Sequence, residues 1–277
     1  MSEARDTDYY LRNPKQWQAR SHPDLVNRKP EELFDKDFAA QYKRLHRDIW
    51  MRICNVHGTL CTLSQLEKFP FEHLYVPGHM EFWRLVVENF FNSAGLTLHG
   101  LVNDKGKDVH SILSFRDVTL QGPWLQPEHR HWLEETLKER DFDKHIKSIL
   151  GRVRIIRNKH VAHRLFDRQN GSPKEVFARV SLNELWKLFD ATHLLFGALS
   201  FGSAYVTLLG DLIPGTVGGQ PTRTCLDDVL DAVLRDSYFV NEPERREQWW
   251  QSDRKRMKPD DLQLMNDLRK RIGLPEA

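Results

Sequence analysis

One short segment, RIIRNKHVAHRLFD over residues 154–167, places an arginine, an amide and two histidines within seven positions. Histidine titrates near neutral pH and can serve as a general base or a general acid. Arginine stays protonated and holds phosphate oxygens with a planar fork of donors. These residue types suit phosphodiester cleavage in RNA: a base removes the proton of a 2′-OH, its oxygen attacks the adjacent phosphorus, and a cation stabilises the developing charge.

Arg157 and His163 are not neighbours on one face of a regular helix. Six residues rotate a helix by about 600°, which leaves the two side chains roughly 120° apart and about 9 Å along the axis. The length of the arginine, a bend in the helix or a second copy of the chain must therefore bring them together. Asn158 can orient the histidine or the phosphate, while His160 is either a second acid or base or a plain surface residue.

Basic residues surround this segment in a chain whose formal net charge is only +2. A local positive patch favours a polyanion such as RNA as the partner. The alternative is a helix whose arginines pair with acidic residues of neighbouring elements. The sequence shows no acidic cluster of the two-metal nuclease kind, so we expect neither a metal nor a cofactor. The candidate RNA-binding residues are Arg152, Arg154, Lys159, Arg164 and Arg168.

The heptapeptide RNKHVAH, from Arg157 to His163, resembles the signature of the HEPN superfamily. In that signature an arginine and a polar residue are followed by four to six spacer positions and a histidine. The likeness is to the HEPN domains of abortive-infection proteins, and it extends over residues 75–205. Residues 82–104 are similar to the long helix that precedes the motif in this family. Residues 108–115 are similar to the short helix that follows this long helix.

The resemblance implies an α-helical domain that dimerises and acts as a metal-independent endoribonuclease on single-stranded RNA, in a defence or toxin setting. Arg157 and His163 would be the catalytic pair, with Asn158 as polar partner, and both subunits would contribute to one cleft. HEPN-like domains also include non-catalytic versions that bind RNA or nucleotides or serve as protein scaffolds. We favour the enzyme, and we expect a homodimer, RNA and an antitoxin or other defence protein as partners.

Helical periodicity predicts the elements that position this segment. Residues 36–60 repeat apolar side chains every three or four positions, with Asp35 or Asp37 as cap. Helices are also predicted for residues 77–104, which should be buried on several sides, and for residues 108–120 with Asp108 as cap. Residues 127–165 should form either one long helix or two shorter ones. Ser181 and Glu184 have capping-box spacing at the start of a helix over residues 181–209. The periodic residues of the first helix are Phe38, Tyr42, Leu45, Ile49 and Ile53.

The predicted fold class is therefore all-α, a HEPN-like helical bundle with an N-terminal arm and a helical C-terminal appendage. The predicted boundaries are an arm over 1–35, a bundle over 36–210, a linker over 211–224 and a helical tail over 225–277. In the tail, Trp249 and Trp250 precede the basic run DRKRMK. The tryptophans either stack on bases or, as we favour, dock the tail onto the bundle.

Three cysteines and no apolar segment near the first residue favour a reducing, cytoplasmic compartment. The longest apolar run, residues 195–210, is too short to span a membrane. Cys54, His57 and Cys61 have residue types that bind zinc, but no fourth ligand is evident. Free, partly buried thiols at a helix end are the favoured alternative.

Overall fold

The computed structural model describes residues 29–69, 71, 80–103, 110–121, 130–131, 134–135, 150–151, 153–154, 180–200, 216–217, 220–221 and 224–275. These residues are mostly helical, which confirms the predicted all-α class. Extended backbone within them takes the form of two-residue strands, β1 (Thr216–Val217) and β2 (Gln220–Pro221), which pair antiparallel inside the predicted linker.

The chain divides into two compact units. Unit 1 comprises Met1–Leu60 and Phe90–Leu209, and unit 2 comprises Cys61–Asn89 and Gly210–Ala277. Helices α5 (Lys36–Lys68) and α6 (Met80–Asn103) each run from one unit into the other. The predicted boundaries between arm, bundle, linker and tail stay a prediction.

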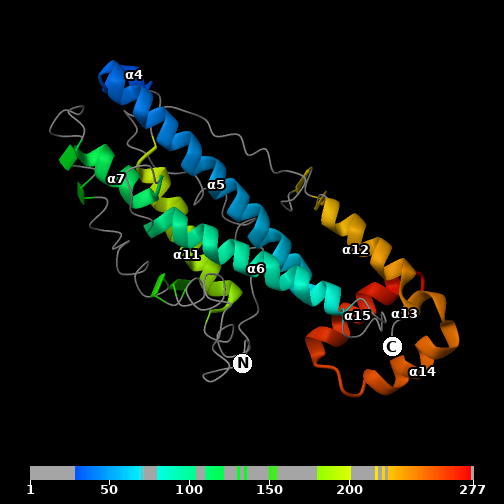
Figure 1. Cartoon of the computed structure of the whole chain (residues 1–277). Coiled ribbons are helices and arrows are strands. Elements are labelled where there is room, and N and C mark those ends of the chain that lie inside the picture. Colours follow the sequence, from blue (N-terminus) through cyan, green and yellow to red (C-terminus); the bar gives the residue numbers. More distant parts are fainter. Residues whose placement is uncertain are drawn as a thin grey trace, which may run out of the picture. The chain divides into compact units, whose positions relative to one another are not determined.

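Helix α5 follows the short helix α4 (Pro30–Leu33) and forms much of the unit 1 core (Figure 1). Its cap is Asp35, whose Oδ1 accepts a hydrogen bond of 2.8 Å from the backbone N–H of Phe38. The predicted periodicity is confirmed for four of its five residues, which are buried in the core, whereas Phe38 is half-buried. Tyr42, Leu45, Ile49 and Ile53 are each at most 6 % exposed.

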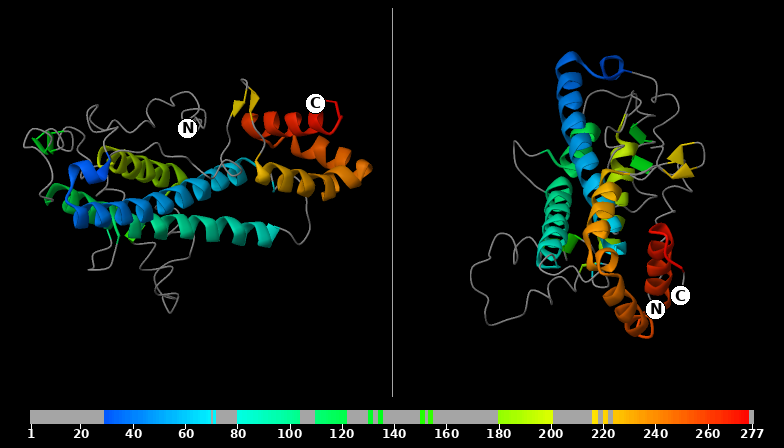
Figure 2. Two further views of the ribbon diagram at one scale, coloured as in Figure 1. Left: turned by 90° about the horizontal axis from the view of Figure 1, so that it is seen from above. Right: turned by 90° about the vertical axis from the view of Figure 1, so that its right-hand side faces the viewer.

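Helix α11 (Leu182–Ala198) lies beside α5 in Figures 1 and 2. The predicted capping box is present: Ser181 Oγ accepts from the Glu184 backbone N–H, and Glu184 Oε2 accepts from the Ser181 backbone N–H. At the other end of α11, the buried Tyr42 hydroxyl donates to the carbonyl oxygen of Leu199 at 2.8 Å. A side chain of α5 thus satisfies one of the carbonyls that a helix C-terminus leaves without a partner.

Helix α7 (Ile112–Gln121) begins later than predicted. The residue that caps it is Ser111, whose Oγ accepts from the Ser114 backbone N–H at 3.2 Å, and not Asp108. Serine and aspartate are both good caps, so residue type alone did not choose between them. Phe115 of α7 is fully buried and packs against Tyr42, with 5.1 Å between ring centroids.

Burial of α6 on several sides holds for its second half alone. Ala94, Leu98, Leu101 and Val102 are at most 1 % exposed, whereas Phe82 and Leu85 are 59 % and 47 % exposed. The prediction is wrong for the first half, where Phe82 and Leu85 lie at the surface, because periodicity shows which positions are apolar and not which of them a neighbouring element covers.

Unit 2 has its own core, built by α12 (Cys225–Asp236), α13 (Tyr238–Asn241), α14 (Pro243–Asp253) and α15 (Pro259–Arg271). Leu234, Trp250, Met265 and Leu268 form its buried apolar cluster. Trp250 is 3 % exposed, so it packs within this core and its ring does not present a face to a base.

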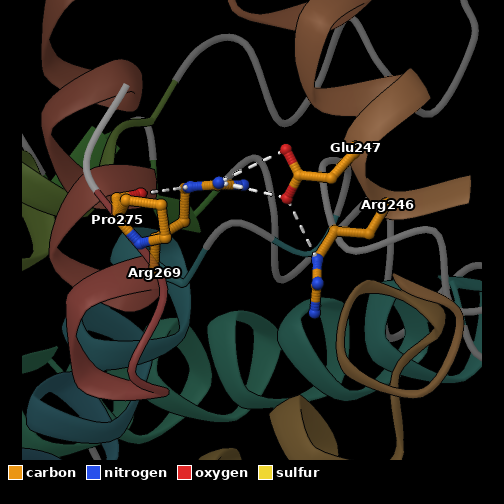
Figure 3. Close-up of polar contacts among 4 residues, drawn as sticks. All are labelled: Arg246, Glu247, Arg269 and Pro275. Carbon is orange, nitrogen blue, oxygen red and sulfur yellow. Dashed lines mark hydrogen bonds and ion pairs between the residues drawn. The ribbon is translucent and has the colours of Figure 1, made fainter. Parts of the chain in front are cut away.

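A buried arginine completes this core (Figure 3). The Arg269 guanidinium carbon lies 4.7 Å from the centroid of the Trp250 ring, a cation–π arrangement. Its Nε donates to the carbonyl oxygen of Pro275 at 2.9 Å, and its Nη2 donates to Glu247 Oε1 at 3.1 Å. Gly273, with φ of 80°, takes the left-handed conformation that lets the chain turn back after α15.

The contact between Tyr42 and Leu199 gives a stability prediction. We expect Tyr42→Phe to lower the free energy of unfolding by about 1–3 kcal/mol, because it leaves a buried carbonyl without a donor. Urea denaturation followed by circular dichroism measures this change. Thr59→Val is the matched control: the Thr59 hydroxyl donates to the carbonyl of Asn55 within α5, at an exposed position. Equal effects of the two substitutions would contradict the assignment.

Candidate functional site

The predicted catalytic residues, Arg157, Asn158, His160 and His163, lie outside the described residues. The same holds for four of the predicted RNA-binding residues, Arg152, Lys159, Arg164 and Arg168. Arg154 is described, and its side chain is exposed.

The residue beside Arg154 connects this region to the core of unit 1. Val153 is fully buried, and its Cγ1 lies 3.9 Å from the point where a Cβ would stand on Gly95 of α6. Val153 therefore packs close to the backbone of α6, while Arg154, the next residue, is exposed to solvent. An exposed cation at this position is available to a phosphate.

Unit 1 contains a continuous row of ring contacts between α5 and α11, which we call the histidine–aromatic row. His57 stacks on Phe189 at 5.2 Å and 12°, and Phe189 is parallel to His193 at 5.9 Å and 4°. Trp50 connects His193 to Phe196 at 6.4 Å and 5.9 Å, and Phe196 meets His46 at 4.6 Å. Residue numbers rise along α5 as they fall along α11, so the two helices are antiparallel.

Burial keeps the histidines of this row neutral. It lowers the pKa of His46, of His57 and of His193 from 6.5 to about 4 in each case. For His57, a positive charge on His193 lowers the pKa further, as a second and smaller cause. Imidazoles that resist protonation and face the interior hold two helices together and cannot donate protons to a substrate near neutral pH.

The hydrogen bonds around His46 fix its tautomer. Ser200 Oγ donates its one proton to the carbonyl oxygen of Phe196 at 2.7 Å, and it also lies 3.1 Å from His46 Nε2. The hydroxyl must accept from His46, so the proton of this neutral imidazole resides on Nε2. The row is thereby linked to the C-terminal end of α11.

A second polar cluster, which the sequence did not reveal, joins α5 to the start of α7. His110 Nδ1 lies 2.5 Å from Asp48 Oδ2, and Arg52 Nη1 donates to the carbonyl oxygen of His110 at 2.6 Å. The His110 side chain is 26 % exposed, so it lies near the surface. Asp48 and Arg52 of α5 hold His110 there, through its ring and its backbone carbonyl. The cluster tethers the segment that leads into α7. Asp48 and Arg52 are one helical turn apart, but no sequence rule pairs them with residue 110.

The zinc alternative finds no support in the geometry. Among the residues that the structure describes, no three or more His, Cys, Asp or Glu side chains gather to hold a metal ion. Cys54 and Cys61 are free and buried, and burial raises their thiol pKa to about 11 and about 12. A metal requires the thiolate, which this environment disfavours.

The fold and the motif define a helical protein of the HEPN class, and comparison with known proteins agrees. A family model for HEPN domains described as AbiU2 matches residues 35–204. Because the match covers more than half of the 277 residues, the chain belongs to this abortive-infection HEPN family, which confirms the resemblance seen in the sequence. No curated protein and no solved structure matches the chain. Within the described helices, none has the length and apolar character that crossing a membrane requires.

The lowered pKa values of the three histidines in the row predict that unit 1 loses folding stability as the pH falls. An unfolded chain binds protons at these histidines near pH 6.5, whereas the folded chain does so near pH 4. Their contribution to stability is therefore complete above pH 6.5 and is lost as the pH falls toward 4, by about 1.4 kcal/mol per unit of pKa difference. Urea denaturation at a series of pH values between 7 and 4 measures the slope.

We expect His193→Phe to make this slope shallower, because it removes one of the protons taken up on unfolding. His131→Gln is the control, since the His131 side chain is 72 % exposed and pairs with Glu135 one turn away. A slope that is the same in both variants and in the parent would show that the row does not control acid sensitivity.

Proposed function

We propose that the protein is a metal-independent endoribonuclease of the HEPN type that cleaves single-stranded RNA in a defence or toxin setting. The observation that carries the proposal is the family match over residues 35–204, which contains the whole segment from Arg157 to His163. We further propose a cytoplasmic setting, where RNA is available, and an antitoxin or other defence protein as the partner that restrains the activity.

In the proposed reaction, His163 removes the proton of a ribose 2′-OH. The 2′-oxygen forms a bond to the adjacent phosphorus, and the bond from phosphorus to the 5′-oxygen of the next nucleotide breaks. The leaving oxygen takes a proton from a second imidazole, either His163 of the second subunit or His160. The products are a 2′,3′-cyclic phosphate and a 5′-hydroxyl, so atoms and charge balance without a metal or an added reactant.

Arg157 has the electrostatic part in this reaction. Its guanidinium would bind the two non-bridging phosphate oxygens, where negative charge grows in the transition state. Asn158 would orient the phosphate or the imidazole. Arg152, Arg154, Lys159, Arg164 and Arg168 would bind flanking phosphates, and the exposed position of Arg154 beside buried Val153 supports this role for one of them.

The described histidines support the choice of His163 for proton transfer. Three of them belong to the histidine–aromatic row, where burial lowers the pKa and ring contacts occupy the imidazole faces. All three side chains are half-buried and packed against other rings, which limits the access of an RNA strand. The histidines of the row are therefore poor candidates, and we assign the acid–base chemistry to the histidines of the family motif on the strength of the family match.

We also propose that the active form is a homodimer, in which Arg157 and His163 of two copies line one cleft. The helical offset of roughly 120° between the two residues supports it. Closed two-fold pairs are the commonest assembly of identical chains.

The nuclease proposal predicts cleavage that resists chelation. Purified protein should cut a labelled single-stranded RNA in the presence of EDTA and leave cyclic phosphate ends, as resolved by gel electrophoresis and mass spectrometry. His163→Ala should lower the rate by at least about a hundredfold, the usual contribution of a general acid or base.

His131→Ala provides the matched control, because it removes an exposed histidine whose ion pair lies within one helical turn. Its rate should equal that of the parent, and circular dichroism should show the same helix content in both variants. Cleavage that stops with EDTA, or that survives His163→Ala unchanged, would overturn the mechanism. RNA binding without cleavage in any buffer would favour the non-catalytic binding or scaffold version.

The shared cleft predicts complementation between inactive chains. Arg157→Ala and His163→Ala chains, each inactive alone, should regain up to about a quarter of the parent activity when they are refolded together, since about half of such pairs are mixed dimers and each of these has one intact Arg157/His163 pair in place of two. In a mixed dimer, one chain supplies an intact arginine and the other an intact histidine. Each variant carries a different affinity tag, so that an excess of either chain can be removed before activity is measured. Mixed dimers that stay inactive would contradict a cleft in which one intact Arg157 and one intact His163 from different chains suffice.

A further inference from the structure

Four cations lie together in the turn between α14 and α15 of unit 2, which we call the basic turn: Arg254, Lys255, Arg256 and Lys258. Lys255, Arg256 and Lys258 are exposed, and Arg254 is half-buried. Among the described residues, none of the four forms an ion pair with an acidic side chain.

The basic turn is held in place by the core of unit 2. Met257, in the middle of the run, packs against the cluster that contains Leu234 and Trp250. The backbone N–H of Arg254 donates to the carbonyl of Trp250 at 3.0 Å, and that of Arg256 donates to the carbonyl of Asp253 at 2.8 Å. The four cations therefore project from a fixed backbone, so less conformational entropy is lost when a ligand orders them.

Charge in unit 2 is segregated. Residues 253–258 carry four basic residues and one aspartate, a formal charge of +3, whereas α12 carries four aspartates and one arginine, a formal charge of −3. Two acidic residues at and after the start of α14 already have partners: the N-cap residue Glu242 pairs with Arg245 at 3.0 Å, and Glu247 pairs with Arg246 and Arg269. Asp260 and Asp261 lie in the first turn of α15, where the helix dipole favours negative charge.

We propose that the basic turn is a second RNA-binding element, which holds phosphates of single-stranded RNA in addition to those bound by the nuclease motif. This inference rests on the proposed function, which supplies RNA as the ligand. The turn lies beyond residue 204, where the family match ends, so it is an addition to the HEPN domain. Trp250 is buried, so its ring does not stack on a base; we expect the exposed cations to bind phosphates, and therefore RNA without regard to sequence.

The test measures affinity with an RNA that cannot be cut. The full chain is titrated into a labelled 30-nucleotide RNA in which every 2′-OH is methylated, and fluorescence anisotropy is followed from 50 to 200 mM KCl. Four lost phosphate contacts on a single strand should reduce the slope of log affinity against log salt by about 3 in the variant with Arg254, Lys255, Arg256 and Lys258 all changed to Gln. An unchanged slope overturns the proposal.

A matched pair of double variants separates position from net charge. Lys255→Gln/Arg256→Gln and Arg235→Gln/Arg245→Gln each remove two exposed cations from unit 2. The first should reduce the slope by about 1.4, and the second should leave it unchanged. Equal reductions by both overturn the proposal, since they would reflect total charge alone. Thermal unfolding checks that both variants keep the parent's stability.

Further outcomes distinguish this inference from the proposed function. If the parent cuts RNA but the quadruple variant binds as tightly as the parent, the basic turn is excluded and the nuclease stands. If the parent binds through the turn but never cuts, the nuclease fails and the turn stands. Where both hold, the quadruple variant should raise KM for a 30-nucleotide RNA at least tenfold and leave kcat unchanged. Parent chains that prefer poly-glutamate of equal charge to RNA would assign the turn to an acidic protein and overturn the proposal.

Discussion

The packing of α5 against α11 through the histidine–aromatic row is the constraint on which the rest of unit 1 depends. Ring stacking has a narrow range of favourable distances and angles, so it fixes the register of two long helices more tightly than aliphatic contacts would. Buried imidazoles strengthen this effect, because each needs a hydrogen-bond partner and tolerates only the neutral form. Where Ser200 meets His46 and Tyr42 meets Leu199, the end of α11 is tied to α5.

Local rules account for the features that could be predicted from sequence. The cap at Asp35, the capping box of Ser181 and Glu184 and the buried stripe of α5 all depend on residues within four positions of one another. The register of the row does not, since His46 and Ser200 are 154 residues apart. Local rules also do not predict which apolar side chains are buried: Phe82 is as apolar as Phe115, yet only Phe115 is buried in the structure. The motif is identified by its resemblance to the family signature, and its assembly into a site stays a prediction.

Arginine shows why residue type alone does not assign function in this chain. Arg269 is 2 % exposed and stabilises a core through Trp250, Glu247 and the carbonyl of Pro275. Arg256, thirteen positions earlier, is exposed on the basic turn. A net charge of +2 for the whole chain conceals both roles, because acidic α12 offsets the basic turn in the sum. A buried arginine such as Arg269 cannot contact a ligand, whereas the exposed cations of the basic turn can. Exposure, and not residue type, therefore makes the basic turn a candidate surface for RNA.

Two kinds of electrostatic contact would divide the work of the proposed nuclease. A cation on the basic turn meets a phosphate that does not react, so its attraction is equal in the ground state and the transition state. Such uniform binding lowers KM and leaves kcat unchanged. Arg157 would instead meet oxygens whose charge increases as the 2′-oxygen attacks, which makes its attraction strongest in the transition state and raises kcat. A basic turn outside the family match could therefore improve the capture of long RNA without altering the chemistry of the HEPN domain, and the two contributions are separable by substitution.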